Sequence, residues 1–235
     1  MGNQCHYCHI PIHFELTWKS IIIQPSPKYL CDDCNKKLHP IKGLTCQTCS
    51  RSLEKLSSEY IKDNICLDCH RWEADPEWSG ILEKNISLYE YNEFLKELIA
   101  RFKFRGDYVL AKIFSQKIKN TLSSMTYDVI IPIPLSKERQ QERGFNQAIA
   151  LAHEAELQTA AILTRIHSEK QSKKSRQERI HIDQVFHLKD DTSMKGKNII
   201  LFDDIYTTGS TLRHAAKQLK IAGASTVKAI TIARG

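Results

Sequence analysis

The sequence has no apolar run long enough to cross a membrane. Its longest apolar stretches, around Ile21–Ile23 and Val129–Leu135, are the length of a strand, whereas a spanning helix needs about 18 or more apolar residues. The chain also begins MGNQCHYC, without the basic and then apolar pattern of an export leader. We therefore expect a cytoplasmic protein that does not insert directly into the membrane.

Cysteine is absent after residue 69, and the eight cysteines of the chain all fall in CxxC pairs before that point. In a reducing cytosol this pattern argues against structural disulfides. Each pair can supply two thiolates from a tight turn, and two pairs complete a tetrahedral site of four cysteines. Pairing in sequence order predicts two structural zinc ions, although a cross-braced pairing is also open. The predicted ligands are Cys5, Cys8, Cys31 and Cys34 for one site and Cys46, Cys49, Cys66 and Cys69 for the other.

Two of the four pairs are followed by histidine, as in c-type haem attachment, and eight thiolates also suit iron–sulfur clusters. Haem attachment requires an exported chain, and the other two pairs lack the histidine. Closed zinc sites with four cysteine ligands leave no coordination position for a substrate. We therefore expect residues 1–75 to form a small double zinc-ribbon domain with a folding role and a docking role.

An excess of charge of either sign is missing from the first 75 residues, where basic and acidic side chains are equal in number. The whole formal charge of +7 therefore belongs to residues 76–235. This surplus can serve a polyphosphate ligand, a nucleic acid or solubility alone, and charge does not choose among them.

The most informative stretch joins an apolar run to two adjacent acids and a loop of small hydroxyl residues. The run Asn198–Phe202 predicts a strand, Asp203 and Asp204 follow it, and an amphipathic helix begins near Leu212. Between them lies the TTGST loop, which consists of Thr207, Thr208, Gly209, Ser210 and Thr211. Small residues let backbone N–H groups face an anion at a helix N-terminus, and the hydroxyls add donors. The pattern predicts a phosphate site beside a carboxylate pair that can bind a diol.

A second turn with basic residues follows the strand expected at residues 128–132. It contains two prolines and continues into Leu135, Ser136, Lys137 and Arg139. In a parallel sheet, the carboxyl end of this strand faces the same crevice as the acid pair. Main-chain N–H groups of Leu135 and Ser136, together with the two cations, are candidates for binding a pyrophosphate. The alternative is a solvated helix start.

Strand and helix patterns alternate through the rest of the chain. Apolar periodicity predicts helices near residues 92–104, 108–122, 145–155 and 212–221, and strands near residues 128–132, 160–163, 185–188, 198–202 and 226–232. This order predicts an α/β domain over residues 80–235, with a parallel sheet covered on both faces. Residues 72–80 are interpreted as a linker, in which Trp72 and Trp78 are expected to pack at the junction.

Two further basic stretches have more than one interpretation. Arg101–Arg105 interleaves cations with Phe102 and Phe104, which can stack unpaired bases. At helical spacing, however, Phe102 or Phe104 is more commonly a core residue, and we expect the core role. Arg165–His181 carries cations that can bind pyrophosphate or DNA phosphates, or can form a solvated surface loop. Its candidate ligand-binding residues are Lys173, Lys174, Arg176 and Arg179.

The strand, the acid pair and the TTGST loop together resemble the phosphoribosyl pyrophosphate (PRPP) loop of type I phosphoribosyltransferases. The resemblance implies Mg²⁺ bound with PRPP, the 5-phosphate on the TTGST loop, and the ribose hydroxyls on Asp203 and Asp204 as candidate catalytic residues. It also implies that Arg165–His181 corresponds to a mobile loop that closes over the pyrophosphate. Enzymes that salvage 6-oxopurines usually carry an aspartate where Thr207 stands, so purine salvage is not expected.

ERGFNQ at Glu142–Gln147, after the proline turn, resembles the ComF/GntX family, as do Phe102–Asp107, Gln171–Ser172 and Glu178–Arg179. That family joins a zinc ribbon to a phosphoribosyltransferase-like domain, so the expected fold is a parallel-sheet α/β domain preceded by a small Cys-rich double zinc-ribbon domain. The resemblance implies a role in natural transformation, on or beside imported single-stranded DNA. Its implied partner is a membrane-associated, ATP-driven DNA translocase of the ComFA type, which would recruit this protein to the DNA-uptake machinery.

Three functions are consistent with these patterns. We favour a PRPP-binding protein that handles single-stranded DNA. The alternatives are an active phosphoribosyltransferase that uses Mg²⁺-PRPP with an unidentified acceptor, and an adaptor that docks a DNA translocase through its zinc domain. The patterns do not indicate an oligomeric state.

Overall fold

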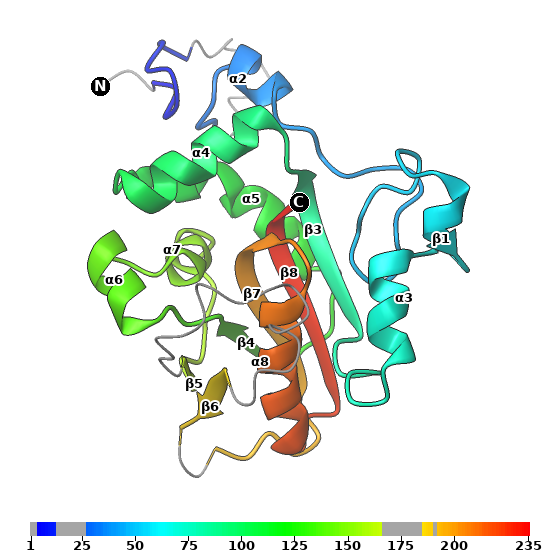
Figure 1. The fold of residues 1–235 in the computed structure, drawn as a ribbon. Coiled ribbons are helices and arrows are strands. Elements are labelled where there is room, and N and C mark those ends of the chain that lie inside the picture. Colours follow the sequence, from blue (N-terminus) through cyan, green and yellow to red (C-terminus); the bar gives the residue numbers. More distant parts are fainter. Residues whose placement is uncertain (1–3, 13–26, 166–184, 190–191) are drawn as a thin grey trace.

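The structure is a computed structural model, and it describes residues 4–12, 27–165, 185–189 and 192–235. Its centre is a four-stranded sheet in which all neighbouring strands run parallel, with the order β3-β8-β7-β4 (Figure 1). The strands are β3 (Lys84–Glu90), β4 (Val129–Pro132), β7 (Asn198–Tyr206) and β8 (Thr226–Arg234). The predicted parallel α/β sheet is therefore confirmed.

Both faces of the central strand β7 are buried. Successive side chains of a strand point to opposite faces, and the four residues Ile199–Phe202 are each no more than 1% exposed. Ile200 and Phe202 belong to one hydrophobic core, and Ile199 and Leu201 belong to another. A continuous apolar run of this kind is typical of a parallel strand with helices on both sides.

One face of the sheet is covered by three helices and the other by α8 (Ser210–Ile221), as Figure 1 shows. The three helices are α4 (Glu93–Phe104), α5 (Lys112–Leu122), which follows the 3-10 turn η2 (Tyr108–Ala111), and α7 (Gln147–Glu154). Helix α4 begins after Asn92, whose side-chain oxygen accepts a hydrogen bond of 2.9 Å from the Leu95 N–H, a preferred N-terminal cap. The predicted helices are confirmed to within a few residues.

Three strand predictions need correction. Strand β3 was not predicted, although it pairs with β8 along most of its length. The strands expected near residues 160–163 and 185–188 are β5 (Leu163–Arg165) and β6 (Phe186–Leu188), which pair antiparallel with each other outside the parallel sheet. Strand β7 does not end before the acids but continues to Tyr206, because β8 keeps pairing with it as far as Arg234.

The N-terminal part of the chain packs on the sheet domain at two places. One is the region of α2 (Asp32–Lys36), which lies beside α4 in Figure 1. The other contains the 3-10 turn η1 (Ser58–Tyr60), the short pair β1 (Ile61–Lys62) and β2 (Ile65–Cys66), and helix α3 (Leu67–Ala74). The expected packing of Trp72 against Trp78 is confirmed, with the ring centroids 5.3 Å apart in an edge-on arrangement.

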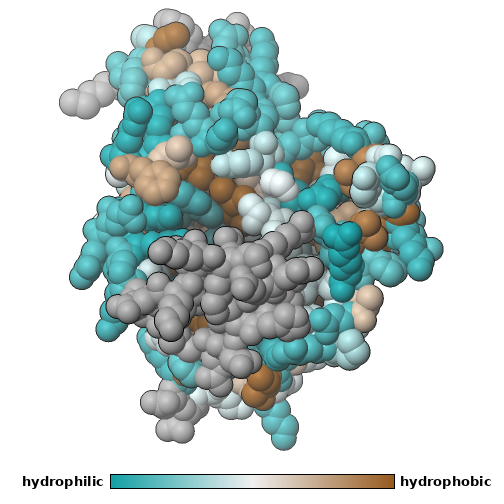
Figure 2. Space-filling view, viewed as in Figure 1, coloured by the Kyte–Doolittle hydropathy of each residue, from teal (hydrophilic) through white to brown (hydrophobic). Residues whose placement is uncertain are grey.

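The surface seen in Figure 2 is largely hydrophilic outside the grey residues, and hydrophobic side chains form scattered patches on it. Among the residues that the structure describes, no helix combines the length and the apolar character needed to cross a bilayer. The short α6 (Lys137–Arg143) lies between β4 and α7 and forms part of the candidate site.

Candidate functional site

The two acids lie inside strand β7 near the carboxyl end of the sheet, and they face opposite sides of it. Asp204, which is 8% exposed, forms an ion pair with Lys103, whose Nζ lies 2.5 Å from a carboxylate oxygen. Lys103 comes from the last turn of α4, and the sequence patterns did not assign it to this site. Asp203 accepts a hydrogen bond of 2.8 Å from the Asp204 N–H. The pair is thus held in place by the strand and by one lysine.

The carboxyl group of Asp203 does not ionise like an ordinary aspartate. Burial raises its pKa to about 7, and the negative charge of Asp204 contributes in the same direction. The Asp204 N–H and the positive charges of Lys103 and Arg165 act against this rise without cancelling it. A carboxyl group whose pKa is strongly shifted by identified causes is a marker of a functional site.

Arg139, Arg143 and Arg165 act on one another or on the acid pair through their charges, and burial is the main influence on the pKa values of two of them. Burial lowers the pKa of Arg143, and the positive charge of Arg139 lowers it further. The same two causes lower the pKa of Arg165, the last residue of β5. Asp203 opposes the lowering in both cases. A group of neighbouring cations is suited to bind a polyanion. Of the three, only Arg139 was a predicted site residue.

The TTGST loop leads from β7 into α8, as predicted, and the helix begins at Ser210. Gly209 is buried and has a φ of 81°, in the left-handed region that favours glycine. A Cβ at this position would collide with the Tyr206 hydroxyl and the Arg213 guanidinium, which lie directly against it. Thr208 Oγ1 accepts a hydrogen bond of 3.4 Å from the Ser210 N–H, and Thr207 is exposed. The loop is closely packed on its inner side.

The predicted pyrophosphate turn reaches the same edge of the sheet as the acids. The Ile133 N–H donates to the Phe202 carbonyl at 2.9 Å, so the turn starts beside the residue that precedes Asp203. Ser136 caps α6 by accepting from the Arg139 N–H at 3.4 Å. Lys137 and Arg139 are exposed, and Leu135 and Ser136 are partly buried. The four predicted residues are therefore brought to the crevice at the start of a short helix.

A groove with a volume of about 690 Å³ continues outward from this turn. Its walls combine aromatic, apolar and basic side chains, among them Tyr108, Leu135, Lys137, Phe145 and Ile149. Tyr108 and Phe145 meet edge-on, with their ring centroids 5.3 Å apart.

The basic and aromatic stripe of α4 is divided between the core and the surface. The expectation that Phe102 or Phe104 is a core residue is confirmed by Phe102, which is 1% exposed, whereas Phe104 is 63% exposed. Phe104 lies on the outer side of the last turn of α4, where the guanidinium of Arg143 stacks over its ring at 5.1 Å. The basic residues Lys173, Lys174, Arg176 and Arg179 fall outside the described residues.

The eight cysteines form two groups in sequence order, which favours the sequential pairing over the cross-braced one. The first cysteine cluster is Cys5, Cys8, Cys31 and Cys34, and the second is Cys46, Cys49, Cys66 and Cys69. All sulfur atoms of a cluster lie within 4.8 Å of one another, and the distances Cys8–Cys31 and Cys49–Cys66 are both 3.7 Å. Four thiolates about 2.3 Å from a tetrahedral zinc ion would be about 3.8 Å apart. Both clusters therefore fit a closed zinc site.

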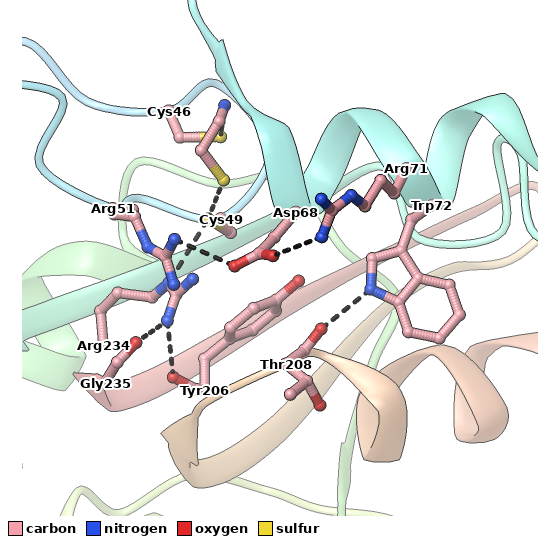
Figure 3. A network of polar contacts seen from close by, with 11 residues as sticks. Cys46, Cys49, Arg51, Asp68, Arg71, Trp72, Tyr206, Thr208, Arg234 and Gly235 are labelled. Carbon is pink, nitrogen blue, oxygen red and sulfur yellow. Dashed lines mark hydrogen bonds and ion pairs between the residues drawn. The ribbon is translucent and has the colours of Figure 1, made fainter. Parts of the chain in front are cut away.

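The second cluster is joined to the TTGST loop by contacts that the sequence did not predict (Figure 3). Trp72, three residues after Cys69, donates its indole N–H to the Thr208 carbonyl at 2.9 Å. Arg234, near the C-terminus, has its Nε 3.4 Å from the Cys49 sulfur and also donates to the Tyr206 carbonyl at 3.3 Å. Spacing within the CxxC pairs gives no indication of such distant contacts.

Known proteins match both the sheet domain and the whole chain. Residues 106–235 match the phosphoribosyl transferase domain family. Competence protein ComFC of Bacillus subtilis is 38% identical over 98% of this chain and 94% of its own length. Competence protein ComFC of Streptococcus pneumoniae is 30% identical over 98% of this chain and all of its own length. The DNA utilization protein YhgH of Escherichia coli is 25% identical over 87% of this chain and 90% of its own length.

Proposed function

This chain belongs to the ComFC family of competence proteins, and on that premise we propose that it binds Mg²⁺-PRPP and handles single-stranded DNA during natural transformation. The observation that carries the PRPP part is the pair Asp203 and Asp204, with four cations around it, directly before the TTGST loop. PRPP has a ribose diol that the acids can bind, a 5-phosphate monoester that the loop can bind, and a pyrophosphate that the cations can bind.

Each part of PRPP has a counterpart among the residues of this chain. The N–H groups and hydroxyls of the TTGST loop would bind the 5-phosphate at the start of α8, and the acid pair would bind the ribose hydroxyls. Lys137, Arg139 and the N–H groups of Leu135 and Ser136 would bind the pyrophosphate. The bound Mg²⁺ would neutralise part of the pyrophosphate charge.

The order of these groups would orient C1 of the ribose toward the groove of Tyr108, Phe145 and Ile149. An acceptor seated there could attack C1 while pyrophosphate leaves, and the chain would contribute positioning and stabilisation of the leaving charge. Binding without turnover is the proposal that we favour. An acceptor screen with release of pyrophosphate as the readout decides between the two.

The PRPP proposal is tested by calorimetric titration of the full-length protein with Mg²⁺-PRPP. We expect the wild type to bind, and the double variant Asp203→Asn with Asp204→Asn to lose binding, because it removes both carboxylates. The thermal unfolding midpoint of the double variant serves as its folding control. An unchanged affinity in the folded double variant would contradict the site.

The single-stranded DNA part is supported by the exposed aromatic side chains next to cations. Phe104 is 63% exposed and stacked with Arg143, and Tyr108 lines the groove together with Lys137. Stacking of a base on an aromatic ring contributes about 1–3 kcal/mol, while cations neutralise the backbone. The Phe104–Arg143 pair and the groove would therefore offer DNA both base stacking and contacts to backbone phosphates, next to the proposed PRPP site.

DNA binding is tested with a fluorescent oligothymidine and the variant Phe104→Ala. We expect this variant to bind about tenfold more weakly, in line with the loss of one stacked base. Tyr60→Ala is the matched control, because Tyr60 is also an exposed aromatic residue, at 49%, but lies in the second cluster region. Affinity should fall steeply as salt rises. A flat salt response, or equal loss in both variants, would contradict DNA binding at this surface.

We also propose that both cysteine clusters bind zinc, that residues 1–75 act as a double zinc-ribbon domain, and that residues 80–235 act as the ligand-binding domain. The protein would work in the cytoplasm and would be recruited to the membrane-associated uptake machinery by a ComFA-type DNA translocase. Native mass spectrometry should count two zinc ions per chain. Co-purification of the full-length protein with the translocase tests the partner.

A further inference from the structure

The TTGST loop is held from outside the sheet domain as well as from within it. Its central peptide, between Thr208 and Gly209, has its carbonyl bonded to the Trp72 indole at 2.9 Å. In a trans peptide the carbonyl and the N–H point in opposite directions. The Trp72 bond therefore directs the Gly209 N–H away from α3, and so fixes the orientation of one of the donors that would meet a phosphate.

Trp72 is itself fixed by the second cysteine cluster and by its packing. Helix α3 begins directly after Cys66 and contains Cys69, so two of the four sulfur ligands are less than two turns from the indole. The ring is 7% exposed, with the guanidinium of Arg213 stacked over it at 4.8 Å and Trp78 at its edge. A displacement of α3 would therefore move the ring, and with it the donor for Thr208.

A second connection reaches Tyr206, the residue directly before the loop. Arg234 lies with its Nε 3.4 Å from Cys49 Sγ, while its Nη1 donates to the Tyr206 carbonyl at 3.3 Å and to the Gly235 carbonyl. The Tyr206 hydroxyl in turn accepts a hydrogen bond of 2.6 Å from Arg213, directly beneath Gly209. Figure 3 shows Arg234 between Cys49 and Tyr206, with a dashed line to each, and Trp72 with its dashed line to Thr208. The residue before the loop and the middle of the loop are thus both connected to the second cluster, through Arg234 and Trp72 respectively.

We propose that the second cysteine cluster is a brace for the TTGST loop, and that Trp72 and Arg234 are the positioning residues through which it acts. The cluster would then set the affinity of this site for a phosphate monoester, beyond its contribution to folding. The choice of ligand rests on the proposed PRPP function, whereas the brace itself is a property of the loop and is measurable without any ligand.

Trp72→Phe tests the brace, because it keeps an aromatic ring and removes only the indole N–H. Trp78→Phe is its matched control: Trp78 is also buried in this junction, and its indole N–H has no hydrogen-bond partner among the described residues. Both variants lose the same atoms from the same kind of surroundings, so their difference isolates the bond to Thr208. Native mass spectrometry checks that each full-length variant keeps its metal.

Three readouts are compared in the wild type and the two variants. In Trp72→Phe we expect ribose 5-phosphate to bind about three- to tenfold more weakly, which corresponds to the loss of one hydrogen bond. Hydrogen exchange of the amides of residues 209–211 should become faster. The affinity for inorganic pyrophosphate should stay unchanged, because that group would bind at the other turn. Trp78→Phe should match the wild type in all three.

Equal exchange rates and equal ribose 5-phosphate affinities in the two variants would overturn the brace. Loss of pyrophosphate affinity together with ribose 5-phosphate affinity in Trp72→Phe would also overturn it, since it would indicate a general loss of structure. A wild type that binds neither PRPP nor ribose 5-phosphate refutes the proposed function instead. In that case the exchange rates of the loop amides still decide the brace.

Discussion

The two cysteine clusters offer a metal ion the same four thiolates, but they are packed on opposite faces of the sheet. Cys5 and Cys34 belong to the hydrophobic core shared with α4, α5 and α7, whereas all four residues of the second cluster belong to the core shared with α8. Cys8 and Cys31 are partly exposed, while every cysteine of the second cluster is buried. The same set of four cysteines therefore lies in two different surroundings, one partly exposed and one buried.

Near each cluster an arginine of the sheet domain contacts a CxxC segment, and a comparison of Arg101 with Arg234 shows the difference most directly. Arg101 of α4 donates to the Tyr7 carbonyl at 2.9 Å, between Cys5 and Cys8, and its guanidinium stacks on the Tyr7 ring at 4.9 Å. Arg234 instead approaches the Cys49 sulfur and bonds to the residue before the TTGST loop. The first arginine fastens a cluster to a helix, and the second fastens a cluster to the candidate site.

The largest effect is expected from variants that remove one cysteine ligand from either cluster, because their ligand affinities should differ. Structural zinc contributes about 10–16 kcal/mol of apparent binding free energy in small domains, so Cys69→Ser and Cys8→Ser should each lose one zinc ion and some stability. Only Cys69→Ser should also lower ribose 5-phosphate affinity, by about tenfold or more, because two bonds to the loop depend on its cluster. Native mass spectrometry and calorimetry give the two readouts. Equal loss of ligand affinity in the two variants would break the comparison.

A substitution in the loop itself should have the next largest effect. Gly209→Ala places a Cβ against Tyr206 and Arg213, so it should displace the loop and abolish detectable ribose 5-phosphate binding while both zinc ions stay bound. Gly144→Ala is the control, because Gly144 has a similar φ of 76° with nothing within 4 Å of the added Cβ. The control should cost only the strain of a left-handed non-glycine residue, about 1–2 kcal/mol. Urea unfolding with calorimetry measures both.

Local patterns predicted the grouping of the cysteines and the location of the acid pair. The sequential pairing that was preferred over a cross-braced one is the arrangement of the two cysteine groups in the structure. The apolar run Ile199–Phe202 identified the central strand, because only a strand covered on both faces is apolar throughout. The small residues after Asp204 identified the start of α8, because the loop needs a positive φ at Gly209.

Those local patterns could not predict contacts between residues that are far apart in the sequence. Strand β3 was missed because two of its buried residues, Asn85 and Ser87, are polar, so its sequence has no continuous apolar run. A strand near residues 160–163 was expected in the parallel sheet. After one hydrogen bond from the Ala160 N–H to the Ile130 carbonyl, however, the chain leaves β4 and pairs with β6 as β5. Lys103 and Trp72 reach the site from 101 and 136 residues away from their partners Asp204 and Thr208, and no local periodicity encodes a distance of that kind.

The arginine pair gives a smaller and sharper test. Arg234→Lys and Arg101→Lys each keep the charge and remove the planar set of donors, so each should lower the free energy of unfolding by about 1.5–3 kcal/mol. Arg234→Lys should also speed hydrogen exchange in residues 207–211, whereas Arg101→Lys should leave it unchanged. Exchange measured by mass spectrometry on the full-length variants distinguishes them. Faster loop exchange in Arg101→Lys would show that the two clusters are coupled to the loop alike.

The smallest expected effect is a dependence of Mg²⁺-PRPP affinity on pH. It tests whether this affinity can fall while both cysteine clusters keep their metal. Asp203 has its pKa raised from 3.8 to about 7, chiefly by burial. The folded state therefore binds a proton more readily than the unfolded state, and stability should fall as pH rises from about 4 to about 7 and then level off. A diol or Mg²⁺-PRPP favours the ionised acid, so affinity should be about tenfold lower at pH 6 than at pH 8.

Asp203→Asn is the variant that assigns this pH dependence. It should bind Mg²⁺-PRPP weakly and with a flatter pH profile, because the group that titrates in the window is gone. Zinc content is followed in the same samples, since thiolate ligands also release metal when protonated. If the zinc ions stay bound at pH 6 while wild-type affinity falls and the Asn variant stays flat, the acid pair controls the ligand independently of either cluster. A profile that follows zinc loss in both proteins would assign the pH effect to the cysteines instead.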